Sequence, residues 1–281
     1  MEYGKIYLVP TPIGNLKDIT LRALEVLQSV DEIAAEDTRQ SLKLLNHFNI
    51  KKPLFSYHQH NEQGKSEDII EKSKAGKSIA IVTDAGTPGI SDPGSVVVCK
   101  CIENNIPFEV LPGATAITTA LVYSGLDTTK FIFRGFIPRE TKDRKILMEE
   151  IKDNKETLIF YESPHRLIDT LSFLREYLGN RQIAVCRELT KLHEDIYRGT
   201  IEEAYNWFVN NKPRGEFVLV ISGKSESEIK AEKEEAFSNL TIEEHLLSLI
   251  DSGVDKKEAV KIVAKERELP KKEVYKISIN I

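Results

Sequence analysis

Short apolar runs recur along the first half of the chain, and segments with helical spacing separate them. Between the runs, apolar residues three and four positions apart, such as Leu21, Leu24 and Leu27, indicate amphipathic helices. Strands alternating with helices are typical of a largely parallel α/β sheet. We therefore expect a first α/β domain over residues 1–125. Its predicted strands are Ile6–Val9, Glu32–Ala35, Leu54–Tyr57, Ser78–Val82 and Phe108–Leu111.

A second series of apolar runs follows and predicts a second α/β domain over residues 126–223. The fourth run comes after the third with only a short polar break, which favours a hairpin of antiparallel strands. We therefore expect a mixed sheet in this domain. Its predicted strands are Phe131–Phe133, Thr157–Tyr161, Ile183–Cys186, Asp195–Gly199 and Phe217–Ile221.

The C-terminal part of the chain changes character. Residues 224–239 are charged and poor in apolar residues, which predicts a linker. Residues 240–281 predict a module of three helices, the first opened by the capping box of Thr241 and Glu244. Over residues 256–276, eight basic residues oppose four acidic ones. We expect this surface to dock the substrate; the alternative is that the helices pack on the main body and leave the lysines solvated.

Composition argues against a disordered protein and against a membrane-spanning one. The 281 residues carry a formal net charge of −5, with 41% hydrophobic and 30% charged residues, values ordinary for a globular protein. No run approaches the roughly 18 apolar residues of a spanning helix, so we expect a cytoplasmic protein. Cys99 and Cys101 lie two positions apart without the further ligands that zinc requires, so no metal is expected.

Three loops rich in glycine, proline and small residues follow predicted strands. They are Pro10–Leu16 after the first strand, Asp84–Gly94 after the fourth and Leu111–Ala116 after the fifth. Because the carboxyl ends of parallel strands meet at one edge of a sheet, these loops should gather there. Glycine lets backbone approach a ligand closely. The pattern predicts a cleft for a small molecule held largely by backbone groups.

Three common motifs are excluded by their spacing. The tripeptide Gly76-Lys77-Ser78 has Glu71 where a phosphate-binding loop needs its first glycine. The stretch Gly89–Gly94 has one residue too many for the nucleophile elbow of a hydrolase. No Gly-x-Gly-x-x-Gly follows the first strand, which argues against a nicotinamide-binding domain.

Polar residues gather where predicted strands end. Asp37 is a candidate helix cap, and the Arg39 guanidinium suits a phosphate or an electron-rich base. Residues 130–145 hold six basic residues and two acidic ones, a local charge of +4. This segment is either a nucleic-acid-binding surface or the solvated start of a helix. Residues 161–166 end a predicted strand and start a helix at the same edge. Residues 187–191 and 193–195 hold possible proton acceptors and phosphate contacts, any of which can instead form surface ion pairs.

Five of these motifs, in this order, closely resemble the tetrapyrrole methylase-like family, and within it the members that methylate ribosomal RNA. The resemblance covers about residues 3–223, and the final helices resemble the C-terminal helical domain of the same group. The motifs are Leu8–Leu16, Ala35–Arg39, Thr83–Gly94, Leu111–Ala114 and Phe160–Arg166.

The resemblance implies a homodimer that binds S-adenosylmethionine between its two α/β domains. It also implies 2′-O-methylation of a cytidine in the decoding region of 16S ribosomal RNA in the small subunit. Carried over by motif, Asp84, Gly86 and Thr87 meet the methionine and ribose parts of the cofactor. The remaining implied cofactor contacts are Pro10, Ala114 and Thr115 at its border, and Phe160, Tyr161 and Cys186 near adenine.

Methyl transfer from a sulfonium mainly requires alignment of the acceptor oxygen at about 3 Å, and a base assists. Glu188, Lys191 and His165 are the candidate proton acceptors, and Arg39, Arg139 and Arg144 the candidate substrate contacts. Two alternatives remain open at this point. A small-molecule methylase of the tetrapyrrole type would use the same cleft, and a non-catalytic RNA-binding assembly factor would leave it empty.

Overall fold

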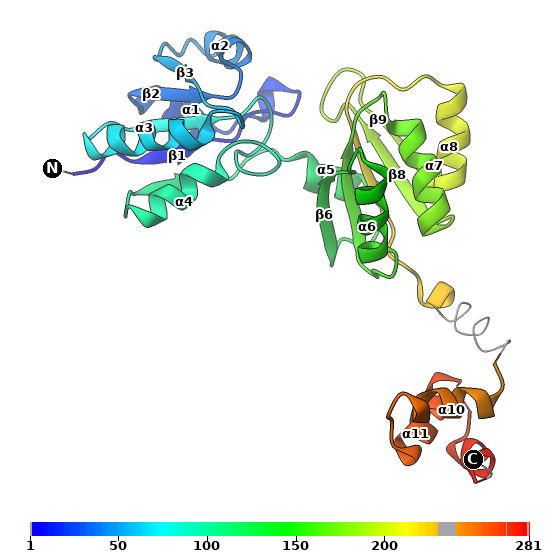
Figure 1. Ribbon diagram of the computed structural model, residues 1–281. Helices are drawn as coiled ribbons and strands as arrows, with labels where there is room; N and C mark the ends of the chain where they lie inside the picture. The colour runs from blue at the N-terminus through cyan, green and yellow to red at the C-terminus, as the bar shows by residue number, and fades with distance from the viewer. Residues whose placement is uncertain (1, 230–239, 268, 280) are drawn as a thin grey trace. The chain divides into compact units, whose positions relative to one another are not determined.

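The computed structural model describes residues 2–229, 240–267, 269–279 and 281. The chain divides into two compact units (Figure 1). The first consists of Met1–Ile151 and Glu156–Ser222, and the second of Lys152–Lys155 and Gly223–Ile281. Of the linker expected over 224–239, residues 230–239 lie outside the described residues.

The first sheet is parallel throughout and has the order β3-β2-β4-β1-β5. This confirms the largely parallel sheet expected from the alternation of strands and helices. Because β1 lies between β4 and β5, the loops that follow these three strands leave the sheet next to one another. The strands are β1 (Ile6–Leu8), β2 (Glu32–Ala35), β3 (Leu54–Ser56), β4 (Ile79–Val82) and β5 (Phe108–Val110).

Helices cover both faces of this sheet, which is why all four residues of β4 are buried. Ala23 and Leu27 of α1 (Leu21–Ser29) and Leu45 of α2 (Thr38–His47) pack on one face. α3 (Glu62–Lys74) and α4 (Ser95–Glu103) pack on the other. A short 3-10 helix, η1 (Leu16–Asp18), precedes α1.

The second sheet is mixed, as predicted, and has the order β6-β7-β10-β8-β9. β6 and β7 pair in parallel, and the other pairs are antiparallel, including the expected pair of β8 and β9. β10 is the last strand in the chain but lies in the middle of the sheet, where all five of its residues are buried. The strands are β6 (Phe131–Phe136), β7 (Thr157–Glu162), β8 (Gln182–Arg187), β9 (Asp195–Thr200) and β10 (Phe217–Ile221).

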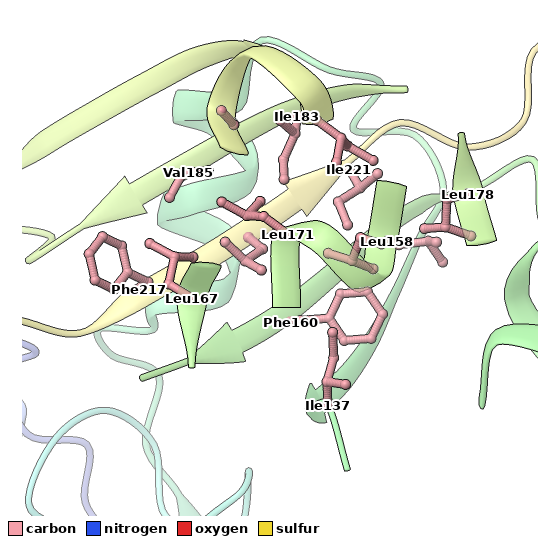
Figure 2. Close-up of a cluster of buried hydrophobic side chains, with 14 of the residues drawn as sticks. Ile137, Leu158, Phe160, Leu167, Leu171, Leu178, Ile183, Val185, Phe217 and Ile221 are labelled. Carbon is pink, nitrogen blue, oxygen red and sulfur yellow. The ribbon is translucent and has the colours of Figure 1, made fainter. Parts of the chain in front are cut away.

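Two cores flank the second sheet. The helices α6 (Thr141–Ile151), α7 (Leu167–Leu178) and α8 (Ile201–Asn210) cover one face, over the buried cluster shown in Figure 2. On the other face, α5 (Ala116–Ser124) packs against Ile159, Ala184 and Val220. α5 precedes the expected domain boundary at residue 125 yet contributes to the second core; the boundary itself stays a prediction.

The second unit contains the three helices expected at the C-terminus. They are α10 (Ile242–Asp251), α11 (Lys256–Glu266) and α12 (Lys271–Ser278). Thr241 and Glu244 form the predicted capping box, and the Asp255 side chain caps α11 by accepting from the Lys257 N–H. Buried apolar side chains from all three helices, including Leu246, Val263 and Val274, form a core of their own.

Candidate active site

A cavity of about 430 Å³ lies in the first unit, between the ends of strands from both sheets. The first sheet contributes the loop after β4 and residues from the loops after β1, β2 and β5. The second sheet contributes β6, the end of β7 and the segments around β8 and β10. The lining includes Glu36, Asp84, Gly86, Thr87, Asp92, Thr115, Phe136, Tyr161, Cys186, Glu188, Lys191 and Glu216.

Backbone contacts tie the three small-residue loops together. Thr11 and Gly86 exchange two hydrogen bonds, with the Thr11 N–H donating to the Gly86 oxygen at 2.9 Å and the Gly86 N–H returning one at 3.0 Å. Gly86 has a φ of +80°, a conformation that residues with a Cβ rarely adopt. The Thr87 hydroxyl donates to the Ala114 oxygen at 3.4 Å. The loops therefore gather at one edge, as expected.

Three carboxylates line the first-domain side of this cavity: Glu36, Asp84 and Asp92. The Asp84 N–H donates to Glu36 Oε2 at 3.3 Å, and the Asp37 N–H donates to Asp84 Oδ1 at 3.2 Å. Burial raises the pKa of each of these two carboxyl groups, Glu36 and Asp84, above the usual value for its residue type. A wall of partly buried carboxylates favours a ligand that carries positive charge.

Asp92 is the most perturbed of the three. Burial, together with the charges of Glu36 and Asp84, raises the pKa of Asp92 to about 7. No hydrogen bond or ion pair joins its carboxylate to any residue that the structure describes. Its carboxylate is therefore available to a ligand and titrates near neutral pH, where a general base works best.

In the sequence, Asp92 followed by Pro93 is most simply interpreted as a helix cap and the first helical residue, so the pattern does not indicate Asp92 as a site residue. That interpretation is wrong: α4 begins at Ser95, and its N-cap is Gly94, with a φ of 144°. Ser91 also has a positive φ, of 64°. The backbone turns through left-handed conformations here, so Asp92 lies on the cavity instead of capping α4.

The second domain provides an aromatic and apolar wall. The rings of Phe136 and Tyr161 meet edge to face with centroids 5.6 Å apart, and both residues line the cavity. Burial and the charge of Asp92 raise the pKa of Tyr161 to about 12. Tyr161 therefore stays neutral and lies within electrostatic reach of Asp92. An edge of this kind suits a flat aromatic ring.

Glu188 and Lys191 line the cavity but form an ion-pair network with Glu216. Lys191 Nζ donates to Glu188 Oε1 at 3.0 Å and to Glu216 Oε2 at 2.7 Å. Burial lowers the pKa of Lys191, but these two hydrogen bonds raise it more, so the net shift is upward. A protonated ammonium accepts no proton, which argues against Lys191 as a base and leaves it the role of a cationic contact.

Glu188 stays ionised for a related reason. Burial raises the pKa of its carboxyl, but hydrogen bonds from the Glu216 N–H, at 2.8 Å, and from Lys191 lower it more. Its acceptor capacity is already partly used by these donors. Glu188 therefore serves better to hold Lys191 than to take a proton.

Several expected cofactor contacts lie on the cavity: Asp84, Gly86, Thr87, Thr115, Tyr161 and Cys186. Pro10 and Ala114 are not among the lining residues. Pro10 packs closely on the loop after β5, since a Cβ on Gly113 would come within 2.4 Å of the Pro10 ring. Phe160 is not brought to the cavity. Phe160 lies in the buried cluster of Figure 2. Tyr161 packs against the cluster on the other face of the sheet, because side chains alternate along β7.

His165 is not among the lining residues either; it is exposed in the turn before α7. The neighbouring Glu162 carboxylate fixes this turn. It accepts from the Ser163 N–H at 2.7 Å and from the Thr170 hydroxyl at 2.6 Å. Of the motif Glu162–Arg166, only Glu162, Ser163 and Pro164 line the cavity.

The three candidate substrate arginines differ sharply in exposure. Arg39 is 86% exposed and forms a bidentate pair with Asp37, whose pKa falls to about 2 because of hydrogen bonds from Arg39. Arg139 is exposed and forms no ion pair with the residues described. Both remain available to a substrate.

Arg144 is buried, which argues against the predicted role as a substrate contact. Its guanidinium donates to the Pro138 oxygen at 2.9 Å, pairs with Asp169 at 2.7 Å and lies over the Phe173 ring. These contacts hold the side chain against its own domain. Its role is to join α6 to α7.

Two features are absent from residues 2–229, 240–267, 269–279 and 281. No group of three or more His, Cys, Asp or Glu side chains in these ranges is placed to hold a metal ion. No helix in the same ranges has the length and apolar character needed to span a membrane.

Comparison with known proteins gives a consistent family. Residues 5–205 match the model of the Tetrapyrrole (Corrin/Porphyrin) Methylases. The fold is similar to that of a solved uroporphyrin-III-C-methyltransferase from Thermus thermophilus, with a TM-score of 0.57 and 21% identity over 77% of this chain and 94% of that chain.

Two curated relatives are especially informative. The Ribosomal RNA small subunit methyltransferase I of Bacillus subtilis is 49% identical over 274 residues, 98% of this chain and 94% of that protein. The protein of the same name from Thermotoga maritima is 46% identical over 221 residues, which cover 79% of this chain but 99% of that protein. About a fifth of this chain thus has no counterpart in the second relative.

Proposed function

This chain belongs to the tetrapyrrole methylase family, whose members take their methyl group from S-adenosylmethionine, and from that premise we propose that it methylates ribosomal RNA of the small subunit. The acceptor we propose is the ribose 2′-oxygen of a cytidine in the decoding region of 16S ribosomal RNA. The observation that supports RNA as the substrate is the 49% identity, over 98% of this chain, to the Bacillus subtilis relative that is named as a methyltransferase of ribosomal RNA.

The cavity fits S-adenosylmethionine in size and chemistry. Its volume of about 430 Å³ lies within the range of small-molecule sites. The carboxylates of Glu36 and Asp84 suit the positive sulfonium and ammonium groups, and the backbone around Gly86 lets the ligand approach closely. The edge formed by Tyr161 and Phe136 suits adenine. These features support Asp84, Gly86, Thr87, Thr115, Tyr161 and Cys186 as cofactor contacts.

When bound, the cofactor supplies a methyl group that its sulfonium has already activated. The chain must then align the acceptor hydroxyl and remove its proton as the new O–C bond forms and the S–C bond breaks. We propose that the carboxylate of Asp92 accepts the proton of the acceptor hydroxyl, because it lines the cavity, has no partner among the described residues and has a pKa of about 7. Lys191, held protonated by Glu188 and Glu216, supplies positive charge for a phosphate or ribose oxygen.

Arg139 is the arginine of the basic 130–145 segment that we propose contacts RNA. Changing Arg139 to glutamate replaces a free surface cation with an anion, so RNA affinity should fall roughly tenfold at moderate salt. The slope of log affinity against log salt should also become shallower, while the affinity for S-adenosylmethionine stays constant. Fluorescence anisotropy with labelled 16S ribosomal RNA measures the slope.

Arg144→Ala is the matched variant in the same segment. It removes a buried guanidinium that forms an ion pair with Asp169 and a hydrogen bond to the Pro138 oxygen, so it should lower thermal stability. The slope of log RNA affinity against log salt should stay unchanged. A shallower salt slope for Arg144→Ala, or an unchanged one for Arg139→Glu, would contradict this division of roles.

We propose that the protein acts as a homodimer in the cytoplasm, where its RNA substrate is found. Apolar Val122 on α5 and Leu192 in the loop before β9 are 75% and 93% exposed, and a second copy would cover such side chains. Leu192→Glu should therefore shift sedimentation velocity toward a single chain of 31.8 kDa. Sedimentation of the unchanged protein as a single chain would contradict the proposal.

The substrate is tested by offering labelled S-adenosylmethionine with one acceptor at a time. We expect methyl transfer to purified small ribosomal subunits and none to uroporphyrinogen. Transfer to the tetrapyrrole alone would support a small-molecule methylase instead. Cofactor binding without transfer to any acceptor would support the non-catalytic assembly factor.

A further inference from the structure

The second unit has the properties of an added module. α10, α11 and α12 bury their apolar side chains against one another, in a core that includes no residue of the two sheets. Arg267 joins the end of α11 to the start of α10 by donating to the Leu240 and Thr241 oxygens at 2.6 and 3.1 Å. The Thermotoga maritima relative is shorter than this chain by about the length of this unit.

Charge is separated along the module. Residues 240–255 contain four acidic residues and no lysine or arginine, whereas residues 256–276 contain eight basic and four acidic residues. On α11, Lys261 pairs with Glu258 at 2.6 Å. The remaining lysines of the basic segment are exposed and form no ion pair with described residues; they are Lys256, Lys257, Lys265, Lys271, Lys272 and Lys276.

Folding does not account for the positions of these lysines. α11 opens with Lys256 and Lys257, and α12 opens with Lys271 and Lys272. The N-terminal end of a helix carries partial positive charge, so cations there weaken the helix. Two helices that both begin with paired lysines sacrifice stability for positive surface charge.

An exposed aromatic ring lies among the lysines of α12. Tyr275 is 56% exposed, and helical spacing places it on the same surface as Lys271 and Lys272, four and three positions earlier. Cations with an exposed aromatic side chain are the combination that binds single-stranded RNA, because the lysines contact phosphates and the ring stacks on an unpaired base.

We propose that the basic surface of α11 and α12 is an RNA-docking site, separate from the cavity, that holds ribosomal RNA while the methylase body acts. This rests on the proposed function for the identity of the RNA. Docking through a tethered module raises the effective concentration of RNA near the methylase body. It therefore lowers the KM for RNA and leaves kcat and cofactor affinity unchanged.

The test uses the full chain with Lys271→Gln and Lys272→Gln together. The probe is a fluorescein-labelled, single-stranded RNA of 20 nucleotides, titrated by anisotropy at several salt concentrations. Loss of two phosphate contacts should weaken binding roughly tenfold and reduce the salt slope by roughly 1.4. Tyr275→Ala should weaken binding roughly fivefold or more, and Tyr275→Phe should restore it, because phenylalanine keeps the stacking face.

The matched control is Lys51→Gln with Lys212→Gln, two exposed lysines of the first unit that form no ion pair with described residues. This control should bind the RNA as the unchanged protein does. Equal binding by the α12 variant and the control would overturn the docking site. So would weakened binding to intact subunits with unchanged binding to RNA, which would identify a protein partner instead.

The same variants separate this proposal from the proposed function. With small subunits as acceptor, the α12 variant should raise KM with kcat unchanged. If the unchanged protein transfers no methyl group to subunits but loses RNA affinity through the α12 changes, the docking site stands and the proposed function falls. If methyl transfer to subunits occurs with a KM that the α12 changes do not alter, the proposed function stands and the docking site falls.

Discussion

Gly86→Val should lower the affinity for S-adenosylmethionine at least a hundredfold. Gly86 has a φ of +80° and exchanges two backbone hydrogen bonds with Thr11, so the loops after β1 and β4 depend on its conformation. Valine strongly disfavours positive φ because both branches of its side chain crowd the backbone. The loop must change shape, and the backbone that meets the ligand moves with it. Isothermal titration calorimetry measures the loss.

Gly179→Val provides the control for strain alone. Gly179 follows α7 with a φ of +70°, and no atom lies within 4 Å of the position that its Cβ would take. This variant should lose thermal stability by an amount similar to Gly86→Val and keep its cofactor affinity. Equal affinity for both variants in their folded states would show that the 84–94 loop does not hold the cofactor.

Asp92→Asn should lower kcat for methyl transfer roughly a hundredfold or more, the usual contribution of a general base. Asparagine keeps the shape of the side chain but does not accept the proton. Asp251→Asn, an exposed substitution on α10, should leave kcat unchanged. Single-turnover rates with saturating RNA measure the effect without interference from product release.

The pH profile gives an independent test of Asp92. Its pKa of about 7 means that the carboxylate is mostly protonated at pH 6 and mostly ionised at pH 8. The transfer rate of the unchanged protein should therefore rise roughly tenfold between these values and then level off. The Asp92→Asn rate should be low and flat. A parallel rise in both proteins would remove Asp92 from the proton transfer.

Asp92 also affects stability, with a definite sign. Its pKa in the folded chain lies above the usual value of 3.8 for an aspartate, so the folded state binds the proton more tightly. The associated stability is full below about pH 4 and is lost as pH rises through 7. Asp92→Asn should therefore melt at a higher temperature than the unchanged protein at pH 8.

Much of the fold follows from local patterns, but strand order does not. The ten apolar runs coincide with β1 to β10, and the short break between β8 and β9 correctly indicated an antiparallel pair. The placement of β10 between β7 and β8 depends on pairing between strands distant in sequence. No periodicity within Phe217–Ile221 carries that information; its continuous apolar run indicates only burial.

The site was less predictable because side-chain direction decides it. Phe160 and Tyr161 are adjacent in β7, so only one of them can face the cavity. Arg144, Met148 and Ile151 are spaced as one helical face, and all three are buried, so the spacing already favoured a structural arginine. Asp92 was not predicted because an aspartate before a proline is typical of a helix cap, whereas the backbone of Gly94, with a φ of 144°, makes Gly94 the N-cap of α4.

The most direct test of the proposed activity is the chemical identity of the methylated nucleoside. Small subunits incubated with the protein and labelled S-adenosylmethionine are digested to nucleosides and analysed by mass spectrometry. We predict a single labelled product, cytidine methylated on its ribose 2′-oxygen, formed by the unchanged protein and lost with Gly86→Val. Label on a base, on another nucleoside or on ribosomal protein would contradict the proposed function.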